Sequence, residues 1–140
     1  SFYHYASGFA ELAASAAGTG NAAYLYGSSG NDVLTARPAR VEFDRAAGWS
    51  DTVATGFERV HAYASGGGLD RAYLYDSSGN DTLFGRGDYG YLTDSRGSYY
   101  LYFKYFDEIF AHSDDDDKST RDIVNVDKSL LYLLELEGTW

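Results

Sequence analysis

Apolar and polar positions alternate along most of this chain, which is the period of a β-strand and not that of a helix. The clearest case is the stretch 72–77. Ala72 and Leu74 share one face of that stretch, and Tyr73 and Tyr75 share the other. A strand with this pattern has one face towards a core of small and aliphatic residues and one tyrosine-coated face.

Aromatic residues and turn signals extend the same pattern. The segment Tyr99–Phe106 is aromatic on both faces, as expected for a strand that is buried on one side and coated with aromatic rings on the other. Fourteen tyrosines, sixteen glycines and a single proline favour strands joined by tight turns. Turn signals lie at Gly66–Asp70, Ser77–Asp81 and Asp94–Ser98. The pattern therefore predicts an all-β fold.

These strands and turns recur with a fixed period. The stretch 23–34 (AYLYGSSGNDVL) returns as 72–83 (AYLYDSSGNDTL), 49 positions later, and the register then holds without a gap. Such a period indicates units that bury their apolar faces against one another. We interpret residues 1–140 as a single repeat domain. Its parts are a partial repeat 1–8, the repeats 9–56 and 57–105, and a degenerate repeat with a cap, 106–140.

Two architectures fit these units. About five short strands per unit correspond to two coils of roughly 20–29 residues, which favours a parallel β-solenoid, like a β-helix or β-roll, of about four to five coils. Like side chains of the two repeats are then expected to lie in columns. The alternative is an antiparallel β-sandwich or prism, because SSGN (77–80) and SRGS (95–98) can each close a hairpin.

The C-terminal segment departs from the alternation. Residues 129–137 (SLLYLLELE) are densely apolar and carry little charge. Asp127 or Ser129 can cap a helix at its start, and Gly138 can end it. We expect a capping helix over the open end of the stack, where backbone edges and core would otherwise be exposed. A last strand is the alternative.

Composition narrows the classes of partner. The net charge is −10, which disfavours nucleic acid and favours cations. The chain has no cysteine, which excludes disulfides, and no apolar run of membrane-spanning length. The run Asp114–Lys118 (DDDDK) is interpreted as a solvated acidic loop, and the three histidines as surface residues. Because 3–9 parallels 51–57, we expect a fragment of a longer protein.

The repeated SSGND turn is the strongest local signal. Its glycine can adopt positive φ, and its aspartate can bind a backbone amide or offer a carboxylate outward. GNDVL and GNDTL resemble the G-x-D-x-U part of the hemolysin-type calcium repeat. The resemblance implies Ca²⁺ as a cofactor, held by turn carbonyls and aspartates. Purely structural turns are the alternative, because Ser-Ser replaces Gly-Gly and the motif is not in tandem. The candidate ligands are Gly30, Asn31, Asp32, Gly79, Asn80 and Asp81.

A second resemblance covers nearly the whole chain. The run LYDS at 74–77 with Gly79 and Asp81, followed by an aromatic stretch and by FDEIFA at 106–111, is similar to roughly 50-residue repeats in large proteins of planctomycete-like bacteria. The resemblance implies an extracellular or cell-surface location, in an array of repeats beside other modules.

Tyrosines are the second candidate binding feature. Tyr24, Tyr26, Tyr73 and Tyr75 are expected to face one way and to stack on sugar rings, or else only to stabilise the sheet. We assign no catalytic residue, because no pair of carboxylates stands out and repeated residues are typical of structural roles. We expect a non-catalytic secreted structural or adhesive module with candidate Ca²⁺ stabilisation. The alternative is a carbohydrate-binding or polysaccharide-active module of a larger enzyme. Expected partners are other repeats of the parent chain and an extracellular polysaccharide or surface protein.

Overall fold

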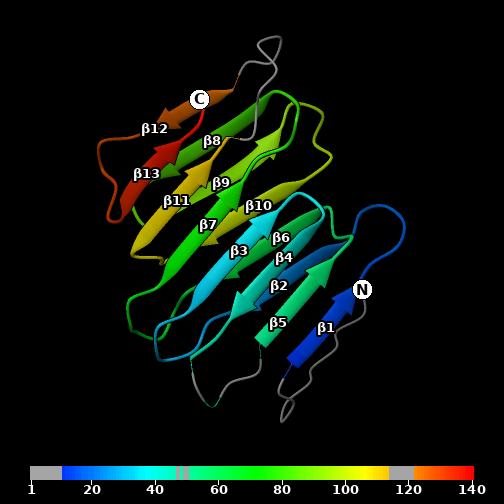
Figure 1. Ribbon diagram of the computed structural model, residues 1–140, viewed down its shortest axis with the longest axis vertical. Helices are drawn as coiled ribbons and strands as arrows, with labels where there is room; N and C mark the ends of the chain where they lie inside the picture. The colour runs from blue at the N-terminus through cyan, green and yellow to red at the C-terminus, as the bar shows by residue number, and fades with distance from the viewer. Residues whose placement is uncertain (1–10, 47, 49–50, 114–121) are drawn as a thin grey trace.

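The computed structural model describes residues 11–46, 48, 51–113 and 122–140. The partial repeat expected at 1–8 and the acidic run Asp114–Lys118 lie outside these residues. The described part of the chain contains thirteen strands in two sheets and no helix, so the all-β prediction is confirmed (Figure 1).

The two sheets are stacked in two layers (Figure 1). Sheet A runs in the order β1 (Glu11–Ser15), β5 (Asp51–Thr55), β4 (Arg40–Asp44), β3 (Val33–Arg37), β7 (Arg71–Tyr75), β11 (Glu108–His112) and β13 (Leu133–Glu137). Sheet B runs in the order β12 (Ile123–Val126), β8 (Asp81–Arg86), β9 (Tyr89–Asp94), β10 (Tyr100–Lys104), β6 (Arg59–Tyr63) and β2 (Ala22–Tyr26).

Both sheets are mixed. The meanders β3–β4–β5 in sheet A and β8–β9–β10 in sheet B are antiparallel. The remaining ladders, such as β3 with β7 and β2 with β6, are parallel. Of the two expected hairpin turns, SRGS (95–98) does join the antiparallel strands β9 and β10. SSGN (77–80) instead carries the chain from β7 in sheet A to β8 in sheet B.

Corresponding strands of the two repeats lie in opposite sheets. Strand β2 lies in sheet B and its copy β7 in sheet A, while the meander β3–β4–β5 lies in sheet A and its copy β8–β9–β10 in sheet B. The prediction of columns of like side chains is therefore wrong: Tyr24 pairs with His61, and Tyr73 with Thr35 and Phe110. The reason is that one unit crosses between the sheets three times, and an odd number of crossings starts the next unit in the opposite sheet.

The C-terminal segment forms a strand. The helix predicted over 129–137 is wrong, and the alternative of a last strand is confirmed, because β13 pairs in parallel with β11. Pairing satisfies backbone groups of β11 that would otherwise form an open edge, which outweighs the local helical preference of leucine. Tyr132 is buried, and Leu134 packs against the core, whereas Leu133 is exposed.

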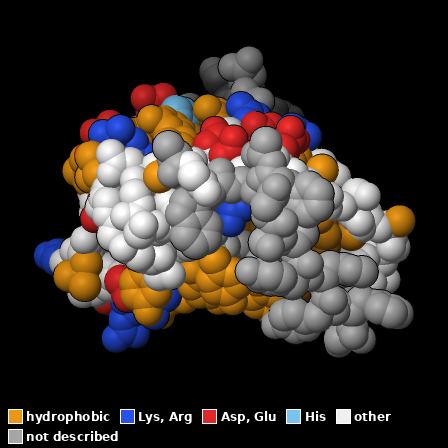
Figure 2. All heavy atoms as spheres, turned by 90° about the horizontal axis from the view of Figure 1, so that it is seen from below, with side chains coloured by type: hydrophobic (Ala, Val, Ile, Leu, Met, Phe, Trp, Pro, Cys, Tyr) orange, Lys and Arg blue, Asp and Glu red, His pale blue; other side chains and the backbone are white. Residues whose placement is uncertain are grey.

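The inward faces of both sheets form one hydrophobic cluster. The alternation is regular, so Ala72 and Leu74 of β7 are completely buried, as the sequence predicts. The largest buried apolar side chains are Phe43, Phe103, Leu34, Leu74, Leu83, Leu92 and Ile109. This core fixes which side chains point outward on each sheet. Figure 2, seen from below, shows most of the visible acidic side chains along the upper side and a hydrophobic patch at the lower centre, with further hydrophobic side chains at the upper left.

Candidate functional site

The first SSGND turn is closed by the carboxylate of Asp32. The amide and the hydroxyl of Ser28 donate to its two oxygens, each over 2.6 Å, and the amide of Ala46 donates over 2.9 Å. Asp32 is completely buried. Asn31 is also engaged, because its side-chain oxygen accepts the amide of Leu69 over 2.9 Å. In this turn the side chains of Asp32 and Asn31 therefore accept hydrogen bonds from backbone amides.

The second SSGND turn has similar hydrogen bonds, except that a different residue supplies one of the donors. The amide and hydroxyl of Ser77 donate to Asp81 Oδ2 over 3.2 and 2.8 Å. The hydroxyl of Tyr99, a buried residue, donates to Asp81 Oδ1 over 2.6 Å, in the place that Ala46 takes in the first turn. Burial raises the pKa of the Asp81 carboxyl, and the hydrogen bonds from Tyr99 and Ser77 oppose that rise.

Aspartates also link neighbouring strands at their starts. The sequence alone did not predict these links. The amide of Asp32, just before β3, donates to Asp70 Oδ1 over 2.8 Å, and the amide of Asp70, just before β7, donates to Asp107 Oδ2 over 2.8 Å. In sheet B the amide of Asp81 donates to Asp122 Oδ1 over 2.9 Å. A sequence signal for these links exists: an aspartate precedes or begins each of these parallel strands.

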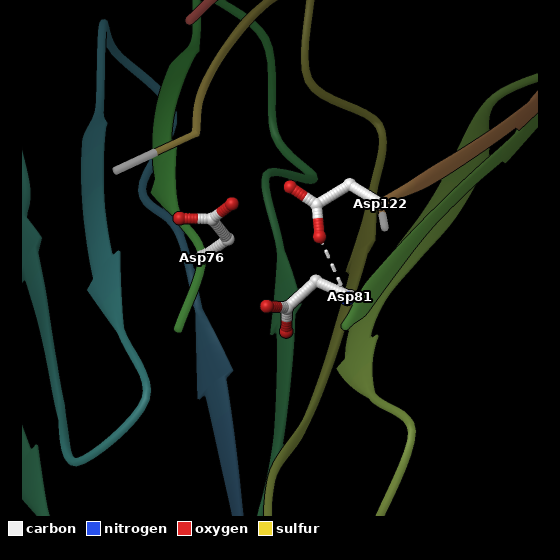
Figure 3. Close-up of side chains that lie close together, drawn as sticks. All are labelled: Asp76, Asp81 and Asp122. Carbon is white, nitrogen blue, oxygen red and sulfur yellow. Dashed lines mark hydrogen bonds between the residues drawn. The ribbon is translucent and has the colours of Figure 1, made fainter. Parts of the chain in front are cut away.

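Three carboxylates gather beside the second turn (Figure 3). Ligand oxygens of Asp76, Asp81 and Asp122 lie within 4.8 Å of one another. They come from the end of β7, the start of β8 and the residue before β12. Such oxygens suit Ca²⁺, but an ion would compete with the Ser77 and Tyr99 donors that already bind Asp81. Of the six candidate ligands, Asp81 alone belongs to this group.

A shallow depression lies where two more carboxylates meet. Its lining includes the backbone of Gly66–Gly68, together with Asp70, Tyr105 and Asp107, and it encloses about 330 Å³. Burial raises the pKa of Asp70 to about 6, the amide of Asp32 opposes this rise, and the nearby carboxylates add to it. Because Asp70 and Asp107 each accept a backbone amide, both have a structural role here.

An aromatic row crosses the outer face of sheet B. Five rings on five adjacent strands stand in register, and they are Tyr24, His61, Tyr102, Tyr91 and Phe84. Tyr24 stacks on His61 with ring centroids 4.7 Å apart, and Phe84 stacks on Tyr91 at 4.9 Å. Burial and the charge of Arg59 lower the pKa of His61. The neutral form of His61 is therefore favoured within the row.

Further rings widen this row into a platform. Tyr26 stacks on Tyr63 at 5.2 Å on one side of the row, and Tyr91 stacks on Tyr100 at 5.3 Å on the other. The aromatic platform, as defined here, has nine rings: Tyr24, Tyr26, His61, Tyr63, Phe84, Tyr89, Tyr91, Tyr100 and Tyr102. Tyr24 and Tyr26, on the edge strand β2, are 53% and 57% exposed and form its open end.

The other two candidate tyrosines lie on sheet A, so the expectation that all four face one way is wrong. Tyr73 stacks on Phe110 at 5.0 Å, and Tyr75 stacks on His112 at 4.7 Å. The guanidinium of Arg37 lies 3.9 Å from the ring centre of Tyr75. Both sheets carry aromatic contacts on their outer faces, but the broad platform belongs to sheet B.

Neither the search for membrane-spanning helices nor the comparisons with known proteins gave a match. Strands are the only regular elements of the described residues, which include no helix that could span a membrane. No family model matches the chain, and searches of curated proteins and of solved structures find no match to it.

Proposed function

We propose that the protein is a non-catalytic, extracellular adhesive module that binds polysaccharide through the aromatic platform of sheet B. The observation that supports this proposal is the row of five rings in register on adjacent strands, with Tyr24 at its end more than half exposed. A tyrosine ring offers a flat apolar face to the C–H groups of a sugar and a hydroxyl to its polar edge.

The size of the platform favours a polymer over a single sugar. Neighbouring strands lie about 4.8 Å apart, so five strands carry the row across about 19 Å. Several consecutive sugar rings can rest on such a surface. Stacked rings also stabilise the sheet itself, by about 0.2–1 kcal/mol for each cross-strand pair. That stabilisation does not require Tyr24 and Tyr26 to be exposed as they are.

The repeat array is the second part of the proposal. Parallel ladders link β2, β6 and β10 in one sheet and β3, β7, β11 and β13 in the other. Strands of further repeats can extend both sheets in the same way, which supports a β-solenoid in a longer parent chain. A strand added next to β2 would lie beside Tyr24 and Tyr26 and would not cover their outward faces. Other repeats, of the planctomycete or hemolysin type that the sequence resembles, are then the immediate partners of this domain.

A catalytic role is less well supported. The carboxylates that come together, Asp70 with Asp107 and Asp81 with Asp122, accept backbone amides. General acid–base work on a glycosidic bond would need two carboxylates facing a substrate. The expected Ca²⁺ at the SSGND turns remains a prediction.

The experiment compares two double variants in affinity electrophoresis through gels that contain soluble polysaccharides. Tyr24→Ala with Tyr26→Ala removes the exposed end of the platform. The retardation of this variant by the polysaccharide in the gel is expected to be at least tenfold smaller than that of the unaltered protein. Tyr73→Ala with Tyr75→Ala is the matched control on sheet A and should retain binding. Equal losses in both variants, or no retardation of the unaltered protein by any polysaccharide, would reject the proposal. Thermal melting checks that each variant is folded.

A further inference from the structure

The outer face of sheet B is cationic in an acidic chain. The protein has 21 acidic and 11 basic residues. The outward positions on the described strands of sheet B nevertheless hold three cations, Arg59, Arg86 and Lys104, and no carboxylate. The two carboxylates on these strands, Asp81 and Asp94, are buried. Charge and aromatic rings are thus combined on one surface.

The cations lie within the platform. Arg59 is next to Tyr100 in the register of β6 and β10, and Lys104 stands between Tyr63 and Tyr89. Arg59 is exposed, and no ion pair joins it to any other described residue. Lys104 is half-buried, and its Nζ lies 3.6 Å from Asp88 and 4.5 Å from the ring centre of Tyr105. Arg86 Nε lies 3.9 Å from Asp127, so Arg59 is the cation of this face without an ion pair among the described residues.

Sheet A shows the contrast. On its outer face Arg71 forms an ion pair with Glu108 at 2.6 Å, and Arg40 pairs with Glu42. Arg71 and Arg40 thus have carboxylate partners on the same sheet, and Arg37 lies against the ring of Tyr75. Arg59 on sheet B therefore retains a guanidinium that can bind a planar anion through two hydrogen bonds.

We infer that the ligand of the aromatic platform is a polysaccharide whose sugars carry carboxylates, with its rings on the tyrosine row and its carboxylates at Arg59 and Lys104. This inference rests on the proposed function. Arginine recognises carboxylates bidentately, whereas a neutral polysaccharide would leave both cations without a use in binding.

The overall negative charge does not prevent this binding. Packed sheets are about 10 Å apart, and the Debye length at physiological ionic strength is about 8 Å. The acidic residues on the outer face of sheet A, such as Glu42 and Glu108, are therefore screened from a ligand on sheet B. Close to the platform, Asp88 and Asp127 offset part of the charge of Lys104 and Arg86, and Arg59 retains its positive charge for a ligand.

The experiment uses polygalacturonate and its fully methyl-esterified form, which share one backbone and differ in charge. Dissociation constants are measured by titration calorimetry. The unaltered protein is expected to bind the acid form at least tenfold more tightly than the ester, and added NaCl should reduce this preference. Arg59→Gln should remove most of the preference and leave binding of the ester intact, and Lys104→Gln should reduce the preference in the same direction. Arg40→Gln on sheet A is the matched control, for which no change is expected.

The outcomes separate the two proposals. If the ester binds as well as the acid and neither Arg59→Gln nor Lys104→Gln changes the ratio, the carboxylate assignment is wrong while polysaccharide binding stands. If neither form binds while another polysaccharide still retards the protein in the gel, the carboxylate assignment is wrong and the proposed function stands. If Tyr24→Ala leaves binding of both forms unchanged, both proposals fail. Sedimentation of the protein alone tests whether the aromatic platform binds a second copy of the chain. A dimer that Tyr24→Ala abolishes would overturn the assignment of a polysaccharide ligand.

Discussion

The amide of Asp32 donates a hydrogen bond of 2.8 Å to the carboxylate of Asp70, at the start of the neighbouring parallel strand. Asp70 in turn donates its amide to Asp107. A carboxylate thus serves as the acceptor that an ordinary sheet would provide from a backbone carbonyl. Asp70 is only 2% exposed, and its burial brings a titratable group into the stability of the fold.

The stability of the protein is expected to decrease as the pH rises from about 4 to about 6. Burial raises the pKa of Asp70 from its ordinary value of 3.8 to about 6. The folded state therefore holds a proton that the unfolded state has released, so the contribution is complete below the unfolded pKa and is lost through the folded pKa. Urea denaturation across this pH range measures the effect.

Asp70→Asn provides the corresponding variant, because its amide oxygen can still accept the Asp32 amide. The slope of unfolding free energy against pH should become flatter over this window. Thr35→Ser on the outer face of β3 is the control, because it alters no titratable group, and it should leave the slope as it is. A slope that is unchanged in Asp70→Asn would contradict the assignment.

Tyr99→Phe is expected to destabilise the protein by about 2 kcal/mol, which is typical of a buried hydrogen bond to a charged group. The Tyr99 hydroxyl donates to Asp81 over 2.6 Å, and its loss leaves that carboxylate oxygen without its donor. Tyr100→Phe, one residue along and on the opposite face of β10, is the control and should cost less than about 0.5 kcal/mol. Equal midpoints of urea unfolding for the two variants would disprove this role of Tyr99.

Gly68→Ala should cost more stability than Gly67→Ala. Both glycines have positive φ, at +107° and +99°, so each alanine carries a similar backbone strain of about 1–2 kcal/mol. A Cβ at Gly68 would also lie 2.5 Å from the backbone of Gly30, whereas one at Gly67 has its nearest neighbour at 4.0 Å. Chemical denaturation of the two variants checks the order. A smaller loss for Gly68→Ala would mean that the turns at 28–31 and 66–69 do not pack against each other.

Calcium is tested by thermal melting with Ca²⁺ against a chelator. Binding at the SSGND turns predicts a higher midpoint with Ca²⁺, and Asp81→Asn should reduce that increase. Asp32→Asn tests the first turn in the same way. Because Asp76 and Asp122 lie beside Asp81 alone, a larger effect at Asp81 is expected. An identical melting midpoint with and without Ca²⁺ would disprove Ca²⁺ binding at both turns.

Local pattern predicted the strands but not their arrangement. The alternation correctly identifies Ala72 and Leu74 as core residues, because burial on one face of a strand follows directly from its period. The exchange of sheets between repeats depends on how each turn directs the chain, and similar turns at 77–80 and 95–98 lead to different outcomes. The leucines of 129–137 favour a helix locally, and only the open edge of β11 makes them a strand.

The candidate platform was partly predictable for the same reason. Tyr24 and Tyr26 follow from the alternation of their own strand, which leaves them on the outer face. His61 joins the row through the register of β2 with β6, and its spacing in the sequence gives no sign of this. Tyr99 shows the converse case: it begins an aromatic-rich segment, and only its hydrogen bond to Asp81 distinguishes it from the other tyrosines there.

The exchange of sheets has a consequence for any longer run of these units. Positions 42 and 91 are equivalent in the two copies, yet Glu42 points outward from one side of the molecule and Tyr91 from the other. Odd and even units would display their meanders in opposite directions. Substitutions in the meanders of odd units would then change one outer face of such an array, and substitutions in the meanders of even units would change the opposite face.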